Sequence, residues 1–399
     1  MSREIPLLSE RRLLLLLAAV QFTHIVDFMI MMPLGPQLTR ELGIDARQFG
    51  ALVSAYGLTA GIVGLAAAPF TDRFDRRKLL LYCYAGFALG TLACGLATSA
   101  PALMLARAMC GAFGGVSGAT LMAIVADVVP PERRARGMGI IMTAFSAAAA
   151  LGVPLGLKIA QEWKWEAPFL AVAVVSMVVW IGLFRILPPV RGHLTGGKVK
   201  SIEDFLELVR NSNAWIGLAL MSAMVLGHFT LIPYLAQHLV GNVGLPEKKL
   251  SLIYLTGGLV TVVTGPLIGR LADRYGRFRV YCVLVVVACT VIRLFTSSGP
   301  QPLWLVLLMA AFFFSCANGR FVPGQAVISL AVPPARRGAY MSLVACSRDL
   351  AAGATATLGS YIVVQGPAGR LLHFDRLGWL AIGASVFSVL IFSRLKSAE

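Results

Sequence analysis

Two basic stretches that repeat each other decide the fold. The first is Asp72-Arg73-Phe74-Asp75-Arg76-Arg77-Lys78, and the second is Asp273-Arg274-Tyr275-Gly276-Arg277-Phe278-Arg279. Another pair, Pro130-Pro131-Glu132-Arg133-Arg134 and Pro333-Pro334-Ala335-Arg336-Arg337, repeats at nearly the same offset, which is about half of the 399-residue chain. Self-similarity at a fixed offset is typical of a duplicated structural unit. We therefore predict two related halves with a pseudo-two-fold axis between them.

Long apolar runs surround each repeated stretch. The chain is 57% hydrophobic and 14% charged, whereas a soluble domain has roughly 25% charged residues. Because a helix needs about 20 apolar residues to cross a bilayer, these runs predict an all-α integral membrane protein with lipid as its main solvent. Twelve spans are predicted, at residues 13–34, 48–70, 79–98, 102–129, 137–159, 167–188, 214–238, 249–270, 280–297, 303–331, 339–364 and 378–394.

Basic residues cluster in alternate loops between these spans. They gather at the N-terminus, in loops 71–78, 130–136, 189–212, 271–279 and 332–338, and in the C-terminal tail. The positive-inside rule therefore predicts a multi-pass protein of the plasma membrane (the inner membrane of a bacterium) with both termini in the cytoplasm. The formal charge of +16 follows from this topology, so we expect no nucleic-acid partner.

The longest polar break divides the chain. We predict an N-terminal six-helix bundle at 1–188, a cytoplasmic linker at 189–212 and a C-terminal six-helix bundle at 213–399. Within the linker, residues 201–209 place apolar side chains on one helical face, and Ser201 with Asp204 approximates a capping box. This pattern predicts a short amphipathic helix on the membrane surface.

Four local motifs together resemble one transporter family. The loop Gly269-Arg-Leu271-Ala272-Asp273-Arg274-Tyr-Gly276-Arg277 is similar to the loop signature of the major facilitator superfamily, although Asp75 replaces a glycine in the first copy. Arg107-Ala-Met-Cys110-Gly111 resembles its Arg-x-x-Gln-Gly motif, with cysteine in place of glutamine. Gly152-Val153-Pro154-Leu155-Gly156, and Asp27 six residues before Pro33, resemble motifs of the twelve-span drug:proton antiporters.

The resemblance implies a fold and two sets of mechanical residues. It implies the major facilitator fold, with twelve helices in two pseudo-symmetric bundles and a cavity lined by the first, fourth, seventh and tenth spans. A helix-sealing motif is expected at Gly152, Pro154 and Gly156. A cytoplasmic gating latch is expected at Asp72, Arg73, Arg76, Asp127, Asp273, Arg274 and Arg277.

Charged side chains inside the predicted spans mark the candidate cavity. A charge at mid-span costs about 2.5–3.5 kcal/mol on insertion scales, so each one needs a reason. We assign proton coupling or substrate contact to Asp27, His24, Arg107, His228, Arg320 and Asp349.

Structural alternatives stay open for these interior charges. Asp27 could be a structural partner of Arg107 or His24, and Arg320 with Asp349 a static pair. We expect Arg348 to point about 100° away from Asp349.

These features predict a secondary active transporter that works by alternating access. Proton-coupled efflux of small amphipathic molecules is the leading hypothesis, with the substrate, protons and the lipid bilayer as partners of a monomer. A uniporter or symporter for a specific metabolite (a sugar, organic anion or lipid) is the alternative, and a membrane sensor a remote one. No nucleophile elbow, His-rich box, metal-ligand cluster or nucleotide-binding loop occurs, so we expect neither an enzyme nor a cofactor nor a metal.

Asp72 provides a test of the latch. An acidic side chain at an inner helix end gains nothing from the positive-inside rule, so we expect it to act in gating. Asp72→Asn should lower transport while leaving the amount of membrane-inserted protein unchanged. Uptake or efflux assays, with insertion measured by immunoblot of membranes, check this; normal transport by the variant contradicts it.

Overall fold

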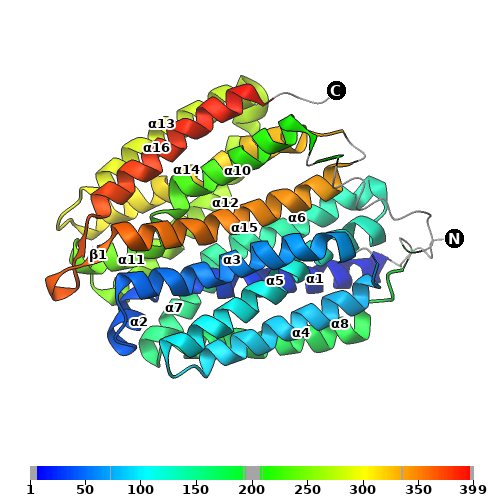
Figure 1. The fold of residues 1–399 in the computed structure, drawn as a ribbon, viewed down its shortest axis with the longest axis horizontal. Coiled ribbons are helices and arrows are strands. Elements are labelled where there is room, and N and C mark those ends of the chain that lie inside the picture. Colours follow the sequence, from blue (N-terminus) through cyan, green and yellow to red (C-terminus); the bar gives the residue numbers. More distant parts are fainter. Residues whose placement is uncertain are drawn as a thin grey trace.

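The computed structural model contains a long bundle of helices with both termini at one end (Figure 1). It describes residues 7–71, 73–191, 194, 207–208, 210–333 and 336–395. In the first half the helices are α1 (Leu7–Ile30), α2 (Gly35–Glu41), α3 (Ala46–Thr71), α4 (Arg76–Gly95), α5 (Ala100–Val128), α6 (Pro131–Ala147), the π-helix η1 (Ala148–Gly152), α7 (Val153–Glu162) and α8 (Ala167–Ile186).

The second half repeats this order with a small addition before its last helix. Its elements are α10 (Ser212–Phe229), α11 (Ile232–Gly241), η3 (Glu247–Lys249), α12 (Leu250–Tyr275), α13 (Arg277–Thr296), α14 (Leu303–Ser329), α15 (Arg337–Ile362), β1 (Val364–Gln365), η5 (Pro367–Gly369), β2 (Leu371–Leu372) and α16 (Phe374–Arg394). The two short strands pair antiparallel, with Val364 opposite Leu372.

The predicted membrane spans correspond to these helices. Among the described residues, 11 helices are long and apolar enough to cross a membrane. The remaining predicted span, 339–364, is the 26-residue helix α15, which is less apolar than the others because it carries Arg348 and Asp349. Two predicted spans are interrupted helices: α10 and α11 form one, and α6, η1 and α7 form the other. The amphipathic helix predicted at 201–209 lies almost entirely outside the described residues.

The first contact between the halves is made by α3 and α15, which run side by side (Figure 1). Gly57 lies against Gly353: a Cβ added at Gly57 would be 2.8 Å from the Gly353 nitrogen and 2.8 Å from the Asp349 carbonyl oxygen. Such distances leave no room for a side chain, so glycine is required for the two backbones to touch. Small residues let membrane helices approach closely in this way.

The second contact between the halves is made by α12 with η1 and α7. A Cβ at Gly258 would be 2.5 Å from the Ala149 carbonyl oxygen. Gly258 and Gly57 are related by the same offset as Asp273 and Asp72, so the contact repeats that of α3 with α15. The local π-helix directly precedes Pro154, whose missing N–H interrupts the α-helical hydrogen bonds.

Gly57→Ala should disturb the contact between α3 and α15, which we call the seam. The added methyl group meets backbone atoms, which cannot turn away as a side chain can, and overpacking of this kind costs about 1–3 kcal/mol. We expect a lower unfolding temperature of the protein and faster amide hydrogen exchange in α2 and α11, which lie at the end opposite the termini (Figure 1). Gly265→Ala on α12 is the matched control, because no heavy atom lies within 4 Å of the added Cβ. Equal exchange in the two variants would refute the role of Gly57.

Candidate functional site

A buried ion pair joins α1 to α5. Asp27 and Arg107 are both fully buried, and Arg107 Nη1 donates to Asp27 Oδ2 at 2.7 Å and to the Asp27 carbonyl oxygen at 3.0 Å. The Arg107 guanidinium also lies over the Tyr56 ring of α3, 4.8 Å from its centroid. The Asp27 carboxylate also interacts with the Thr91 hydroxyl, whereas Arg107 Nε and Nη2 have no hydrogen-bond partner among the described residues. The pair is therefore neutral overall but incompletely hydrogen-bonded.

His24 does not bind Asp27, although the two residues share a helix face. Its Nε2 lies 3.0 Å from the Ser117 hydroxyl oxygen, and its ring packs edge-on against Phe87 with centroids 4.2 Å apart. The imidazole is held by α4 and α5, and no hydrogen bond between His24 and Asp27 is found among the described residues. Arg107 is the partner of Asp27.

In the second half, Arg320 and Asp349 do not form the static pair that the sequence left open as an alternative. Arg320 is 1% exposed and its Nη1 donates to Ser385 Oγ of α16 at 2.8 Å. His228, on α10, hydrogen-bonds the Met224 carbonyl oxygen through Nδ1 at 2.8 Å. Asp349 lies on α15 and pairs elsewhere, since α14 and α15 touch only slightly.

Asp349 pairs instead with its sequence neighbour. Arg348 Nε donates to Asp349 Oδ1 at 3.0 Å, and Nη2 lies 3.0 Å from the same oxygen. The expectation from helix geometry failed because the arginine side chain is long enough to turn back by one residue. The Arg348 and Asp349 side chains are 47% and 26% exposed, and both interact electrostatically with Tyr56. This accessible pair is therefore within electrostatic range of Tyr56, whose ring the Arg107 guanidinium contacts.

Aromatic side chains connect the halves beside these charges. The Phe28 ring of α1 lies 5.2 Å from the Tyr56 ring and 6.0 Å from the Phe229 ring of α10. Phe28 and Phe229 are related by the offset of the repeat, so they meet close to the pseudo-two-fold axis. The centre of the molecule thus combines aromatic surface with one accessible ion pair.

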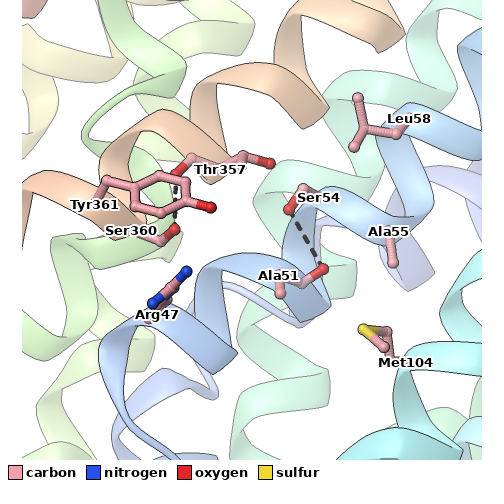
Figure 2. Close-up of a pocket in the computed structure, with 9 residues that line it drawn as sticks. All are labelled: Arg47, Ala51, Ser54, Ala55, Leu58, Met104, Thr357, Ser360 and Tyr361. Atoms are coloured by element: carbon pink, nitrogen blue, oxygen red, sulfur yellow. Dashed lines mark hydrogen bonds between the residues drawn. The ribbon is translucent and has the colours of Figure 1, made fainter.

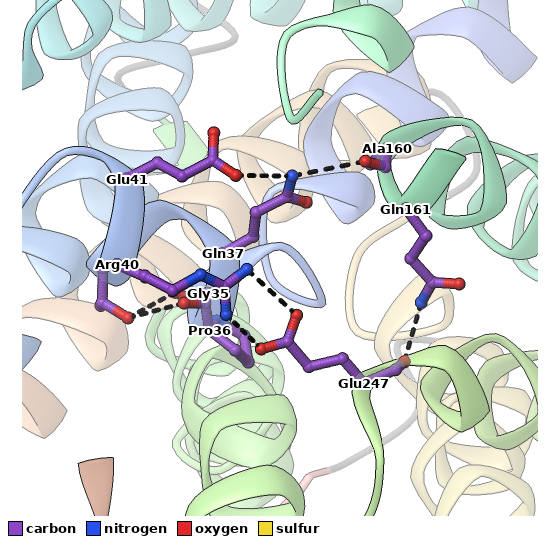
Figure 3. A network of polar contacts seen from close by, with 9 residues as sticks. Gly35, Pro36, Gln37, Arg40, Glu41, Ala160, Gln161 and Glu247 are labelled. Carbon is purple, nitrogen blue, oxygen red and sulfur yellow. Dashed lines mark hydrogen bonds and ion pairs between the residues drawn. The ribbon is translucent and has the colours of Figure 1, made fainter. Parts of the chain in front are cut away.

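The end opposite the termini is closed by polar contacts between the halves (Figure 3). Arg40 of α2 forms two hydrogen bonds with Glu247 of η3, at 2.5 and 3.3 Å. Gln161 Nε2 donates to the Glu247 carbonyl oxygen at 2.8 Å. Sequence reasoning missed this cluster, because Arg40 was read only as a loop residue; a complementary acid in the equivalent loop of the other half was the available signal.

A cavity of about 280 Å³ opens beside the α3–α15 seam (Figure 2). Its walls are Ser54 and Leu58 on α3, Thr357 and Tyr361 on α15, and Met104 on α5. Arg47 lies over the Tyr361 ring at 4.8 Å. None of the residues predicted for the transport site lines this cavity.

Comparison with known proteins identifies the family. The sequence profile of the Major Facilitator Superfamily matches residues 17–356, and residues 223–397 match it again. The chain belongs to the major facilitator superfamily. The family and the chain's relatives are membrane transporters and not enzymes, as the sequence indicated.

Relatives of this superfamily member cover nearly the whole chain. The putative transporter AraJ of Escherichia coli is 24% identical over 378 residues, 91% of this chain and 90% of AraJ. A probable sugar efflux transporter of Helicobacter pylori is 22% identical over 350 residues, 86% of this chain and 88% of that protein. The crystal structure of a D-xylose-proton symporter has a TM-score of 0.74 at 15% identity and covers 95% of this chain and 97% of that one, a likeness of fold.

The gating latch expected of a superfamily member is only partly visible. Arg76 Nη1 contacts Asp127 Oδ2 at 2.9 Å, within the first half. Asp72 lies outside the described residues, and Arg73 stacks on the Phe70 ring at 5.4 Å. Among the described residues, Asp273, Arg274 and Arg277 form no ion pair, although Arg274 stacks on Tyr275. No described ion pair at this end joins the first half to the second.

Asp75 explains the departure from the superfamily loop signature. Gly276, at the equivalent place in the second copy, has a φ of 93°, which favours glycine. Asp75 has a φ of −58° and caps α4 by accepting from the Arg77 amide at 3.0 Å. It also accepts from Arg191 Nε at 2.8 Å and from the Val190 amide at 3.3 Å. In the first loop, a carboxylate therefore replaces the glycine turn and forms hydrogen bonds with the first residues of the linker.

The helix-sealing motif packs inside its own half. Gly152 is in contact with Val26 of α1, and a Cβ at Gly156 would be 2.9 Å from Ile30 Cδ1. The contact with the other half is made by the preceding Ala149 and Ala150 at Gly258. The glycines of the predicted motif therefore pack α7 against α1, and η1 is the segment that contacts α12 of the other half.

Asp75→Ala should loosen this loop in a pH-dependent way. Burial raises the pKa of Asp75, but its hydrogen bonds with Arg191, Arg77 and Val190 outweigh burial and leave it below its ordinary value of 3.8. The stabilisation is therefore complete above pH 3.8 and is lost as the pH falls through the lower folded value. We expect a loss of about 1 kcal/mol near pH 7, measured by denaturant or thermal unfolding.

Asp75→Asn is the control for this prediction, because it keeps a capping oxygen but no charge. Its stability should lie between those of the wild type and Asp75→Ala at pH 7. A difference between wild type and Asp75→Asn that grows on acidification would contradict the prediction.

Proposed function

We propose that this superfamily transporter exports small amphipathic molecules by alternating access, driven by protons that bind Asp27. The observation that carries the proposal is the placement of the Asp27–Arg107 pair. Arg107 contacts the Tyr56 ring, and Tyr56 adjoins Gly57, which touches Gly353 of the other half. A change of charge at Asp27 therefore acts on a side chain at the seam.

Protonation of Asp27 would remove the partner of Arg107. A guanidinium does not lose its proton in proteins, so it must find new acceptors or move when Asp27 becomes neutral. Its Nε and Nη2 have no present acceptors among the described residues. Breaking one side of a buried ion pair costs about 3–5 kcal/mol, which is sufficient to drive a change between two conformations.

The distribution of polar contacts supports alternating access. The end opposite the termini is fastened by Arg40, Glu247 and Gln161, which join the two halves there. With the predicted orientation, this conformation is closed on the outside. The Arg40–Glu247 pair is partly exposed, with side chains 59% and 32% accessible, so it is weak enough to open.

The centre of the protein supports amphipathic substrates. Phe28, Phe229 and Tyr56 offer aromatic surface, and Arg348 with Asp349 offers an accessible positive and negative group. A molecule with one apolar and one polar face fits this combination. A sugar carrier is a second candidate, because the Helicobacter pylori relative is named a probable sugar efflux transporter. Sugars in the same liposome assay as amphipathic dyes decide between the two.

Asp27→Asn should uncouple transport from protons. Asparagine keeps the size of the side chain and an oxygen for Arg107 but cannot carry the proton. In proteoliposomes with an imposed pH gradient, we expect the variant to lose active efflux. Solute exchange at equal pH, which needs no net proton movement, should continue and controls for folding. Undiminished gradient-driven efflux by Asp27→Asn would refute the assignment of the proton site.

A further inference from the structure

Arg320 is a buried charge that the transport mechanism does not use. It is 1% exposed, and it lies among α10, α14 and α16 inside the second bundle. Its Nη1 donates to Ser385 Oγ, while Nε and Nη2 have no hydrogen-bond partner among the described residues. Three N–H bonds of a permanent cation are thus directed into protein without an acceptor.

No carboxylate of the surrounding helices reaches this cation. α10, α13 and α14 contain no aspartate or glutamate, and Asp375 is the single acidic residue of α16. Asp375 is ten residues from Ser385 along the helix, which is about 15 Å. The acids of α12 and α15 are Asp273, which is exposed at its helix end, and Asp349, which pairs with Arg348.

In the first bundle, a carboxylate of the chain itself balances the charge of the buried arginine. There, the buried arginine of α5 is neutralised by Asp27 of α1. The offset that relates Asp72 to Asp273 places His228 of α10 where α1 has Asp27. His228 lies within electrostatic range of Arg320 but donates Nδ1–H to the Met224 carbonyl oxygen, and it supplies no negative charge. By the same offset Arg107 corresponds to Leu308 and not to Arg320. The second bundle therefore has a buried cation at another level of its helix and no carboxylate where α1 has Asp27.

We propose that a small monovalent anion, of the size of chloride, binds beside Nε and Nη2 of Arg320. One negative charge balances the single guanidinium, and its lone pairs accept the N–H bonds that have no acceptor. The neighbouring Ser385 and His228 are 0% and 3% exposed, so the site is closed to solvent, which favours a small ion over an organic acid. The anion neutralises Arg320 as the Asp27 carboxylate neutralises Arg107, and it is a fixed structural ligand.

Thermal unfolding of the purified full-length protein tests the site. The protein is titrated with sodium chloride or sodium bromide, with sodium gluconate keeping the ionic strength constant. An ion that binds only the folded state raises the unfolding temperature in a saturable way. We expect such a rise with chloride and bromide and none with gluconate, which is too large. In crystals grown with bromide, an anomalous peak should lie beside Arg320.

Three variants identify the origin of the effect. Arg320→Met should be insensitive to chloride, because it removes the charge that needs a partner. His228→Asp installs the carboxylate of the first bundle and should also abolish the chloride effect, while unfolding in gluconate at or above the wild-type temperature. Arg293→Gln is the matched control, because Arg293 lies over the Trp379 ring away from the site; it should respond to chloride as the wild type does.

The outcomes that overturn the proposal are distinct. A wild-type unfolding temperature that is equal in chloride and gluconate refutes the site. A chloride effect that persists in Arg320→Met places the anion elsewhere. If Arg320→Met does not fold, His228→Asp decides, because an undiminished chloride effect in that variant also overturns the proposal.

Discussion

The direct contact of backbones at Gly57 and Gly353 is the constraint on which the arrangement of the halves depends. Two helices whose backbones touch have no interlocking side chains between them. They can therefore slide or separate without first disengaging such groups. The repeat supplies a second contact of this kind, at Gly258 and Ala149. The halves are therefore joined along two matching seams, and the polar contacts at one end only select which end is closed.

Much of this fold could be predicted from the sequence, because hydropathy and the repeated loops depend on local composition. The failures at Asp349 and Arg40 have a different cause. Their partners are chosen by the reach of flexible side chains and by contacts between distant segments, which periodicity does not report. The same holds for Asp75, whose capping of α4 and binding of Arg191 compensate for a missing glycine. The burial of Arg107 and Arg320 was predictable, and Arg107 was one of two partners expected for Asp27. The contact of Arg320 with Ser385 was not expected.

Buried charge has been handled differently in the two halves after duplication. In a membrane, an ionised side chain needs a partner that stays with it, since no water is available to replace one. The first half carries that partner within the chain, as Asp27. The second half has histidine at the equivalent position and leaves the charge of Arg320 to be balanced by something outside its neighbouring helices. Among the described residues, the buried carboxylate that pairs with a core arginine therefore belongs to the first half.

The same difference between the halves determines which contact between helices lies next to a buried ion pair. In the first half, Tyr56 precedes Gly57 and its ring receives Arg107, so the ion pair and the seam share two adjacent residues. The offset of the repeat places Gly257 at the position of Tyr56 in the second half, and Gly257 packs directly on Phe314. With Gly257 in place of Tyr56 and Leu308 in place of Arg107, the second seam has no contact of this kind. In the mechanism that we propose, a proton on Asp27 therefore acts on the contact of α3 with α15 and not on the contact of α12.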